Sequence, residues 1–74
     1  KNLKNIDKNV LLNPKIISLV EKQKDELGKK GRILLRPSGT EDLIRIMVEC
    51  TDSNLLKSTA EIISKAIIKE NDNK

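Results

Sequence analysis

Six consecutive residues, Arg36-Pro37-Ser38-Gly39-Thr40-Glu41, carry groups that can hold an anion, and Arg45 follows in the next apolar run. A glycine lets the backbone approach a ligand closely, and successive N–H groups of a turn can point at one anion. Ser38 and Thr40 add hydroxyl donors, and the planar guanidinium groups of Arg36 and Arg45 match phosphate oxygens. The pattern predicts a phosphate site made by Arg36, Ser38, Gly39, Thr40 and Arg45.

The distribution of arginine supports this prediction. Of the fifteen basic residues only Arg32, Arg36 and Arg45 are arginines, and all three lie close to the loop, whereas lysines are scattered from Lys1 to Lys74. Proline, serine, glycine and threonine are also common in ordinary surface turns, so composition alone leaves that alternative open. Arg32 by itself is better interpreted as a surface charge at a strand end.

Catalytic chemistry is not indicated within this chain. The sequence has no histidine, and no lysine has the spacing of a base near Ser38, so we interpret Ser38 as a hydrogen-bond donor rather than a nucleophile. The aspartates are spread along the sequence and predict no oxygen cage for a metal ion. They are Asp7, Asp25, Asp42, Asp52 and Asp72.

Length and composition predict one small domain with an aliphatic core. The chain has 74 residues, is 36% hydrophobic and has no Phe, Tyr or Trp, which is near the lower size limit for independent folding. The net charge of +4 suits an anionic ligand without requiring nucleic acid. Cys50 excludes an internal disulfide and fits a reducing cytoplasm, and no signal peptide or membrane span is expected.

Local patterns predict five elements. Asn9–Leu12 is expected to be a first strand, and a helix follows, with Asn13 as N-cap, Pro14 at its first position and Gly28 as C-cap. Residues 32–36 and 43–50 alternate as two strands of an antiparallel hairpin. A last helix begins after Asp52 or Ser53, and its apolar stripe is Leu55, Leu56, Thr59, Ile62, Ile63, Ala66 and Ile67.

The predicted order strand–helix–strand–strand–helix indicates an α+β fold, with two helices packed on one face of a small antiparallel sheet. Side-chain alternation places Arg36 and Arg45 on the face away from the core. We expect residues 1–8 to be a linker, 9–70 the domain and 71–74 a frayed tail. Because the chain has no initiator Met, we expect it to come from the C-terminal end of a longer protein.

The run from Gly31 to Glu49, GRILLRPSGTEDLIRIMVE, closely resembles the C-terminal domain of phosphohexomutases. The resemblance extends from about Asn9 to Ile68 and is greatest to the bacterial phosphoglucosamine mutases. It implies an enzyme that interconverts the 6-phosphate and 1-phosphate of glucosamine through a phosphoserine, a Mg²⁺ ion and a bisphosphate intermediate. One departure is Asp42, since the family usually has proline there.

By resemblance, Arg36, Ser38, Gly39, Thr40 and Arg45 grip the substrate phosphate that is not being transferred. The expected partners are a phosphosugar and the other domains of the parent chain, and neither nucleic acid nor membrane. No cofactor is expected in this domain; Mg²⁺ and the phosphoserine belong elsewhere in the parent enzyme, so the fragment alone is expected to be inactive.

Two alternatives remain. One is the corresponding domain of a phosphoglucomutase or phosphomannomutase. The other is a small basic module that binds nucleic acid, although the chain has no aromatic side chain on which bases stack.

Overall fold

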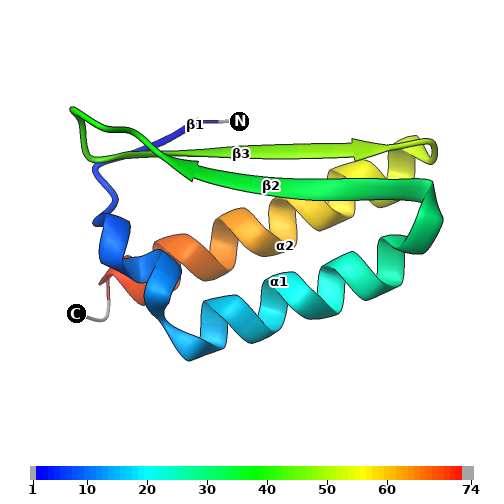
Figure 1. The fold of residues 1–74 in the computed structure, drawn as a ribbon, viewed down its shortest axis with the longest axis horizontal. Coiled ribbons are helices and arrows are strands. Elements are labelled where there is room, and N and C mark those ends of the chain that lie inside the picture. Colours follow the sequence, from blue (N-terminus) through cyan, green and yellow to red (C-terminus); the bar gives the residue numbers. More distant parts are fainter. Residues whose placement is uncertain (1, 73–74) are drawn as a thin grey trace.

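A computed structural model describes residues 2–72 as an α+β fold, with both helices covering one face of a three-stranded antiparallel sheet (Figure 1). This arrangement confirms the predicted fold class. In chain order the elements are β1 (Asn2–Lys4), the 3₁₀ helix η1 (Lys8–Leu12), α1 (Pro14–Leu27), the 3₁₀ turn η2 (Gly28–Lys30), β2 (Gly31–Pro37), β3 (Leu43–Cys50) and α2 (Ser53–Asp72).

The strand order β1-β3-β2 makes β3 the central strand. The β2–β3 hairpin pairs residues 31–37 with residues 50–44, and β1 pairs with the opposite side of β3 at residues 43–45. On β2, Ile33 is buried while Arg32 and Arg36 are exposed; on β3, Ile44 and Ile46 are buried. The predicted alternation of both hairpin strands is therefore confirmed.

Capping residues set the start and end of α1 and the start of α2 at the predicted positions. The Asn13 side chain accepts a hydrogen bond from the Lys15 N–H at 2.9 Å, and Gly28 ends α1 with a positive φ of 55°. At α2, the Asp52 carboxylate accepts from the N–H groups of Asn54 and Leu55, at 3.0 and 3.2 Å. Asp52, rather than Ser53, is thus the N-cap.

The core between sheet and helices is aliphatic, as the composition predicted. Its buried members are Leu3, Ile6, Val10, Ile16, Val20, Leu27, Ile33, Ile44, Ile46, Ile63 and Ile67. Ile62, which we placed on the apolar stripe of the last helix, is instead 42% exposed. The buried stripe is narrower than predicted because the sheet covers only the side of α2 that carries Thr59, Ile63 and Ile67.

The prediction of a strand over Asn9–Leu12 is wrong. Lys8–Leu12 forms a 3₁₀ helix whose first turn is capped by Asp7, which accepts from the Asn9 N–H at 2.9 Å. The first strand is instead Asn2–Lys4, inside the segment that we expected to be a linker. Leu3 and Ile6 are buried, so over residues 2–8 the segment belongs to the folded domain; Lys1 lies outside the described residues.

The expected tail at residues 71–74 is also wrong over its first two residues, because α2 continues through Asp72. Asn71 holds the N-terminal segment: its side-chain oxygen accepts from the Asp7 N–H at 3.0 Å, and its amide donates to the Asn5 carbonyl at 3.3 Å. Residues 73 and 74 lie outside the described residues. In the described part of the chain, 2–72, no helix has the length and apolar character needed to cross a membrane.

Candidate phosphate-binding site

The two predicted arginines face each other directly. The register places Arg36 on β2 opposite Arg45 on β3, and both side chains are exposed on the sheet face that the helices leave open. A hydrogen bond from the Ser38 N–H to the Leu43 carbonyl, at 2.8 Å, closes the hairpin next to them. Since hydrogen-bonded pairs alternate along an antiparallel ladder, Arg36 and Arg45 also form a hydrogen-bonded pair, with Cα atoms about 5.5 Å apart.

The loop folds around the Ser38 hydroxyl. Its oxygen lies 3.4 Å from the Thr40 nitrogen and 3.3 Å from the Glu41 nitrogen, so two successive N–H groups converge on one point. These distances are long for hydrogen bonds, which makes the two contacts weak. In both contacts the Ser38 hydroxyl oxygen is the acceptor, so its donor role toward an anion stays a prediction.

A cavity of about 190 Å³ lies at this end of the sheet and is lined by Arg36, Pro37, Ser38, Leu43 and Arg45. Three of the predicted residues, Arg36, Ser38 and Arg45, therefore share one cavity. Gly39 and Thr40 do not line it; both are exposed on the loop that follows Ser38. A side-chain Cβ at Gly39 would have no atom within 4 Å, so the backbone there is open to solvent and to a ligand.

The charges of the site are uncompensated. Within residues 2–72 no carboxylate forms an ion pair with Arg36 or Arg45; the ion pairs there join Lys15 to Glu70, Lys24 to Glu21 and Arg32 to Glu49. Arg32 differs from the other two arginines, since its Nε donates to Glu49 at 2.8 Å, and this hydrogen bond and charge raise the pKa of Arg32. The open face thus carries two arginines available to an anion and a third that is neutralised, which agrees with our interpretation of Arg32 as a surface charge.

Sequence reasoning missed one polar residue at the site, Asn2. It lies opposite Arg45 on β1, and its side-chain oxygen accepts a hydrogen bond from the Arg45 Nε at 3.3 Å. Asn2, Arg45 and Arg36 therefore form a row across the three strands. No local pattern signals this contact, because it joins residues 43 positions apart.

The described residues form no cluster of potential metal ligands. No group of three or more Cys, Asp or Glu side chains within residues 2–72 lies close enough to hold a metal ion. The residues present therefore do not fit a Mg²⁺ site. What the geometry offers to an anion is two guanidinium groups and one hydroxyl around a single cavity.

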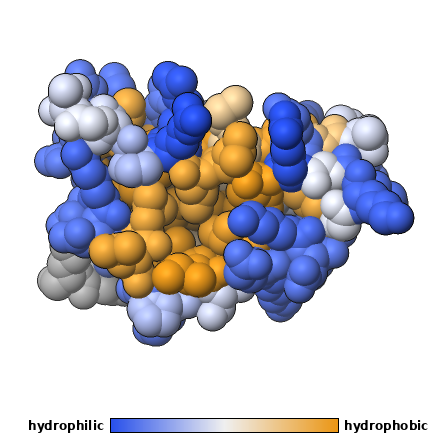
Figure 2. All heavy atoms as spheres, viewed as in Figure 1, coloured by the Kyte–Doolittle hydropathy of each residue, from blue (hydrophilic) through white to orange (hydrophobic). Residues whose placement is uncertain are grey.

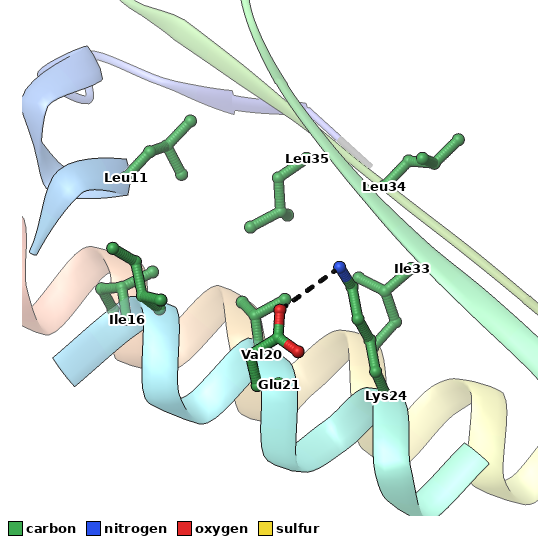
Figure 3. A pocket seen from close by; sticks show the side chains of 9 residues that line it. Leu11, Ile16, Val20, Glu21, Lys24, Ile33, Leu34 and Leu35 are labelled. Carbon is green, nitrogen blue, oxygen red and sulfur yellow. Dashed lines mark ion pairs between the residues drawn. The ribbon is translucent and has the colours of Figure 1, made fainter. Parts of the chain in front are cut away.

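A second hollow lies on the helix side of the sheet, between α1 and β2 (Figure 3). It has a volume of about 340 Å³, and its walls are mainly aliphatic. Its charged residues, Glu21 and Lys24, pair with each other at 3.6 Å. This groove has no concentration of positive charge, so it is not a candidate for the predicted phosphate site.

Comparison with known proteins supports the family indicated by the loop. Residues 2–66 match the model of the phosphoglucomutase/phosphomannomutase C-terminal domain. The chain is 46% identical over 55 residues to a phosphoglucosamine mutase of Coxiella burnetii, covering 74% of this chain and 12% of that protein. It is 48% identical over 59 residues to the enzyme of Actinobacillus succinogenes, covering 80% and 13%.

A third relative, the phosphoglucosamine mutase of Histophilus somni, is 60% identical over 48 residues, covering 65% of this chain and 10% of that enzyme. The chain thus spans about an eighth of the length of these curated relatives. The match to the family model covers nearly all of the described residues. This chain belongs to the phosphoglucomutase/phosphomannomutase C-terminal domain family.

Proposed function

We propose that this chain is the substrate-phosphate-binding domain of a phosphoglucosamine mutase, which interconverts glucosamine 6-phosphate and glucosamine 1-phosphate. The observation that carries the proposal is the pair of facing arginines, Arg36 and Arg45, beside Ser38 and with no carboxylate partner among residues 2–72. Sugar phosphates are the anions that the names of the relatives imply. A phosphomutase of glucose or mannose is the alternative, since the family model includes both.

In this proposal the domain positions the substrate and does not perform the chemistry. The guanidinium groups of Arg36 and Arg45 bind oxygens of the phosphate that stays on the sugar, and the Ser38 hydroxyl donates a hydrogen bond to a third oxygen. Binding energy from this remote group holds the sugar so that its other end is presented to the reacting groups. A phosphoserine and Mg²⁺ would supply the transfer from other parts of the longer enzyme, and no step of it is assigned to residues 2–72.

The single Cys50, a free thiol, is compatible with the reducing cytoplasm in which we place the enzyme. Nucleic acid is a poorer fit to the same site, because the two free arginines are concentrated at one end of the sheet rather than spread along a groove. A single phosphate group is the ligand that this geometry suits.

The direct test is a titration of the ¹⁵N-labelled chain with glucosamine 6-phosphate, glucose 6-phosphate and inorganic phosphate, followed by NMR. We expect shifts confined to Ser38, Gly39, Thr40 and Arg45, with affinity around millimolar, equivalent to about 4 kcal/mol. The three ligands should bind similarly because only the phosphate is contacted. Shifts spread over the lysines of α1 and α2, with none at the loop, would reject the site.

Assay of the longer enzyme then decides the substrate. Turnover of glucosamine 6-phosphate, lowered about tenfold or more by Arg36→Ala through loss of a charge-assisted contact worth about 1.5–3 kcal/mol, would support the assignment. If the enzyme prefers glucose or mannose phosphate and Arg36→Ala lowers that turnover by the same factor, the chain would be assigned to a phosphoglucomutase or phosphomannomutase instead.

A further inference from the structure

In the part of the chain that the structure describes, the outer edge of β2 has no strand beside it, since β2 is terminal in the order β1-β3-β2. The Ser38-to-Leu43 hydrogen bond fixes which backbone groups point inward. Because pairing alternates, the N–H and C=O groups of Ile33 and Leu35 point away from β3. Within residues 2–72, no hydrogen bond between backbone groups of different elements reaches Ile33 or Leu35.

The middle of this edge lacks the features that usually protect exposed strands. Natural edges carry charged side chains, proline or a bulge, or are covered by another segment. On β2 the charged residues, Arg32 and Arg36, flank the run Ile33-Leu34-Leu35, which has neither charge nor proline, and the register with β3 is regular throughout. Only Pro37, at the end of β2, interrupts the row of donors. The edge is therefore competent to pair with another strand.

Apolar surface lies along the same edge. The groove between α1 and β2 opens beneath Leu35 and Ile33, with Val20 on its opposite wall (Figure 3). Figure 2 shows hydrophobic side chains across the middle of this side of the molecule. Ile17, 49% exposed, lines the groove, and Leu34, 44% exposed, borders it from β2.

The sequence of the edge strand is nearly the same in both directions: Arg32-Ile33-Leu34-Leu35-Arg36. In an antiparallel pair of two such strands centred on Leu34, Ile33 of one copy lies opposite Leu35 of the other. These are the two residues whose backbone groups point outward, so they form the hydrogen-bonded pairs of the new ladder. Leu34 meets Leu34 at the two-fold axis.

The arginines at the two ends of this pairing repel each other, but the repulsion is partly compensated. Arg32 of one copy lies opposite Arg36 of the other, but Arg32 already pairs with Glu49 of its own chain at 2.8 Å. The carboxylate of Glu49 thus reduces the repulsion across the junction. The pairing is isologous, the type of contact from which most homodimers are built.

We propose that β2 is an interface between two copies of this chain, which pair edge to edge into one continuous antiparallel sheet. The two grooves then meet beneath the junction, and the apolar lining of each copy, including Ile17 and Leu35, covers that of the other. Arg36 and Arg45 stay on the open face, so the phosphate site is accessible in the dimer. This inference does not depend on the proposed function.

The test is sedimentation velocity of the chain over a range of concentrations, with a matched pair of variants. The expected mass at high concentration is twice the monomer mass of 8.3 kDa. Leu34→Lys places two like charges at the two-fold axis and should weaken dimerisation about tenfold or more. Ile62→Lys is the control, since Ile62 lies on α2 and is similarly exposed, at 42% against 44%.

Amide hydrogen exchange provides the second measurement, in case circular dichroism shows that Leu34→Lys does not fold. Exchange at Ile33 and Leu35 should slow as the concentration of the unmodified chain rises, whereas exchange at the neighbouring Leu34 should not change, because its N–H already pairs within the sheet. A chain that stays monomeric overturns the proposal and assigns the groove to some other occupant. A dimer that persists in Leu34→Lys, or is lost equally in Ile62→Lys, overturns it as well.

Discussion

Arg36 and Arg45 lie directly opposite each other on the open face of the hairpin, and neither forms an ion pair within residues 2–72. Like charges at directly opposed positions destabilise a sheet. An empty site therefore carries repulsion that a bound dianion would replace with charge-assisted hydrogen bonds. The arrangement is unfavourable for the fold alone and favourable for a fold that binds phosphate.

Arg36→Ala should therefore change affinity and stability in opposite directions. Loss of a charge-assisted contact worth about 1.5–3 kcal/mol should weaken phosphate binding about tenfold or more. Removing the repulsion with Arg45 should raise the free energy of unfolding by about 0.2–1 kcal/mol. NMR titration and urea unfolding of the same variant measure the two effects.

The matched control is Arg32→Ala, which removes another exposed arginine from the same sheet face. Because Arg32 is already held by Glu49, we expect phosphate affinity to be unchanged by its loss. If phosphate affinity fell equally in Arg32→Ala and Arg36→Ala, binding would depend only on the net charge of the chain. The facing pair of arginines would then have no special role.

Gly39→Ala separates the needs of the ligand from those of the fold. Gly39 does not have a positive φ, and a Cβ there would contact nothing within 4 Å. The free energy of unfolding of the variant should therefore lie within about 0.5 kcal/mol of that of the original chain. If phosphate approaches the loop backbone closely, the added methyl group should still weaken binding. Unchanged phosphate affinity would show that the ligand does not reach the backbone at this residue.

Gly31→Ala is the informative contrast. A Cβ at Gly31 would collide with the Glu49 carbonyl oxygen and the backbone of Cys50. This substitution should therefore destabilise the hairpin. Gly31 is required by the fold, whereas Gly39 is not. Urea unfolding should therefore show a clear loss of stability for Gly31→Ala and almost none for Gly39→Ala.

Prediction from sequence succeeded where the signal is local. The caps at Asn13 and Gly28 lie within a few residues of the groups they satisfy, and the alternation of Leu43–Cys50 reports directly which face is buried. The same alternation placed Arg36 and Arg45 on one face, although it did not give their register. That register follows from how the loop between β2 and β3 closes at Ser38.

Prediction failed where the deciding partner is distant in sequence. The strand Asn2–Lys4 has one buried side chain, Leu3, and it exists because residues 43–45 of β3 pair with it. The contact of Asn2 with Arg45 was missed for the same reason. Neither a short polar segment nor its spacing reveals a pairing of this kind.

Asp42→Pro should be tolerated or mildly stabilising. The structure uses the carbonyl of Asp42, which accepts from the Ile6 N–H at 3.0 Å, and proline keeps that carbonyl. Proline in a compatible loop conformation typically stabilises by about 0.4–1 kcal/mol. The variant also removes a negative charge from the loop between β2 and β3, so phosphate affinity should rise slightly. A clear fall in thermal stability would reveal a role for the Asp42 side chain or N–H.

Asn71→Ala should loosen the N-terminal segment from the end of α2. The variant loses the contacts to Asp7 and to Asn5, a residue held at a positive φ of 60° that non-glycine residues rarely adopt. Two hydrogen bonds of ordinary strength amount to about 1–3 kcal/mol, which urea unfolding can resolve. Asn9→Ala serves as the control, because the exposed Asn9 contributes only its backbone N–H to the capping contact with Asp7.

The consequence of Asn71→Ala should extend beyond stability. Asn5 is followed by Ile6, whose N–H donates to the Asp42 carbonyl in the loop between β2 and β3. Releasing Asn5 should therefore increase amide exchange at Ile6 and at Leu3 before the hairpin itself opens, since β2 and β3 pair independently of β1. If exchange at these two residues matches that of the Asn9→Ala control, then β3 alone holds β1 in place and the contacts of Asn71 are incidental.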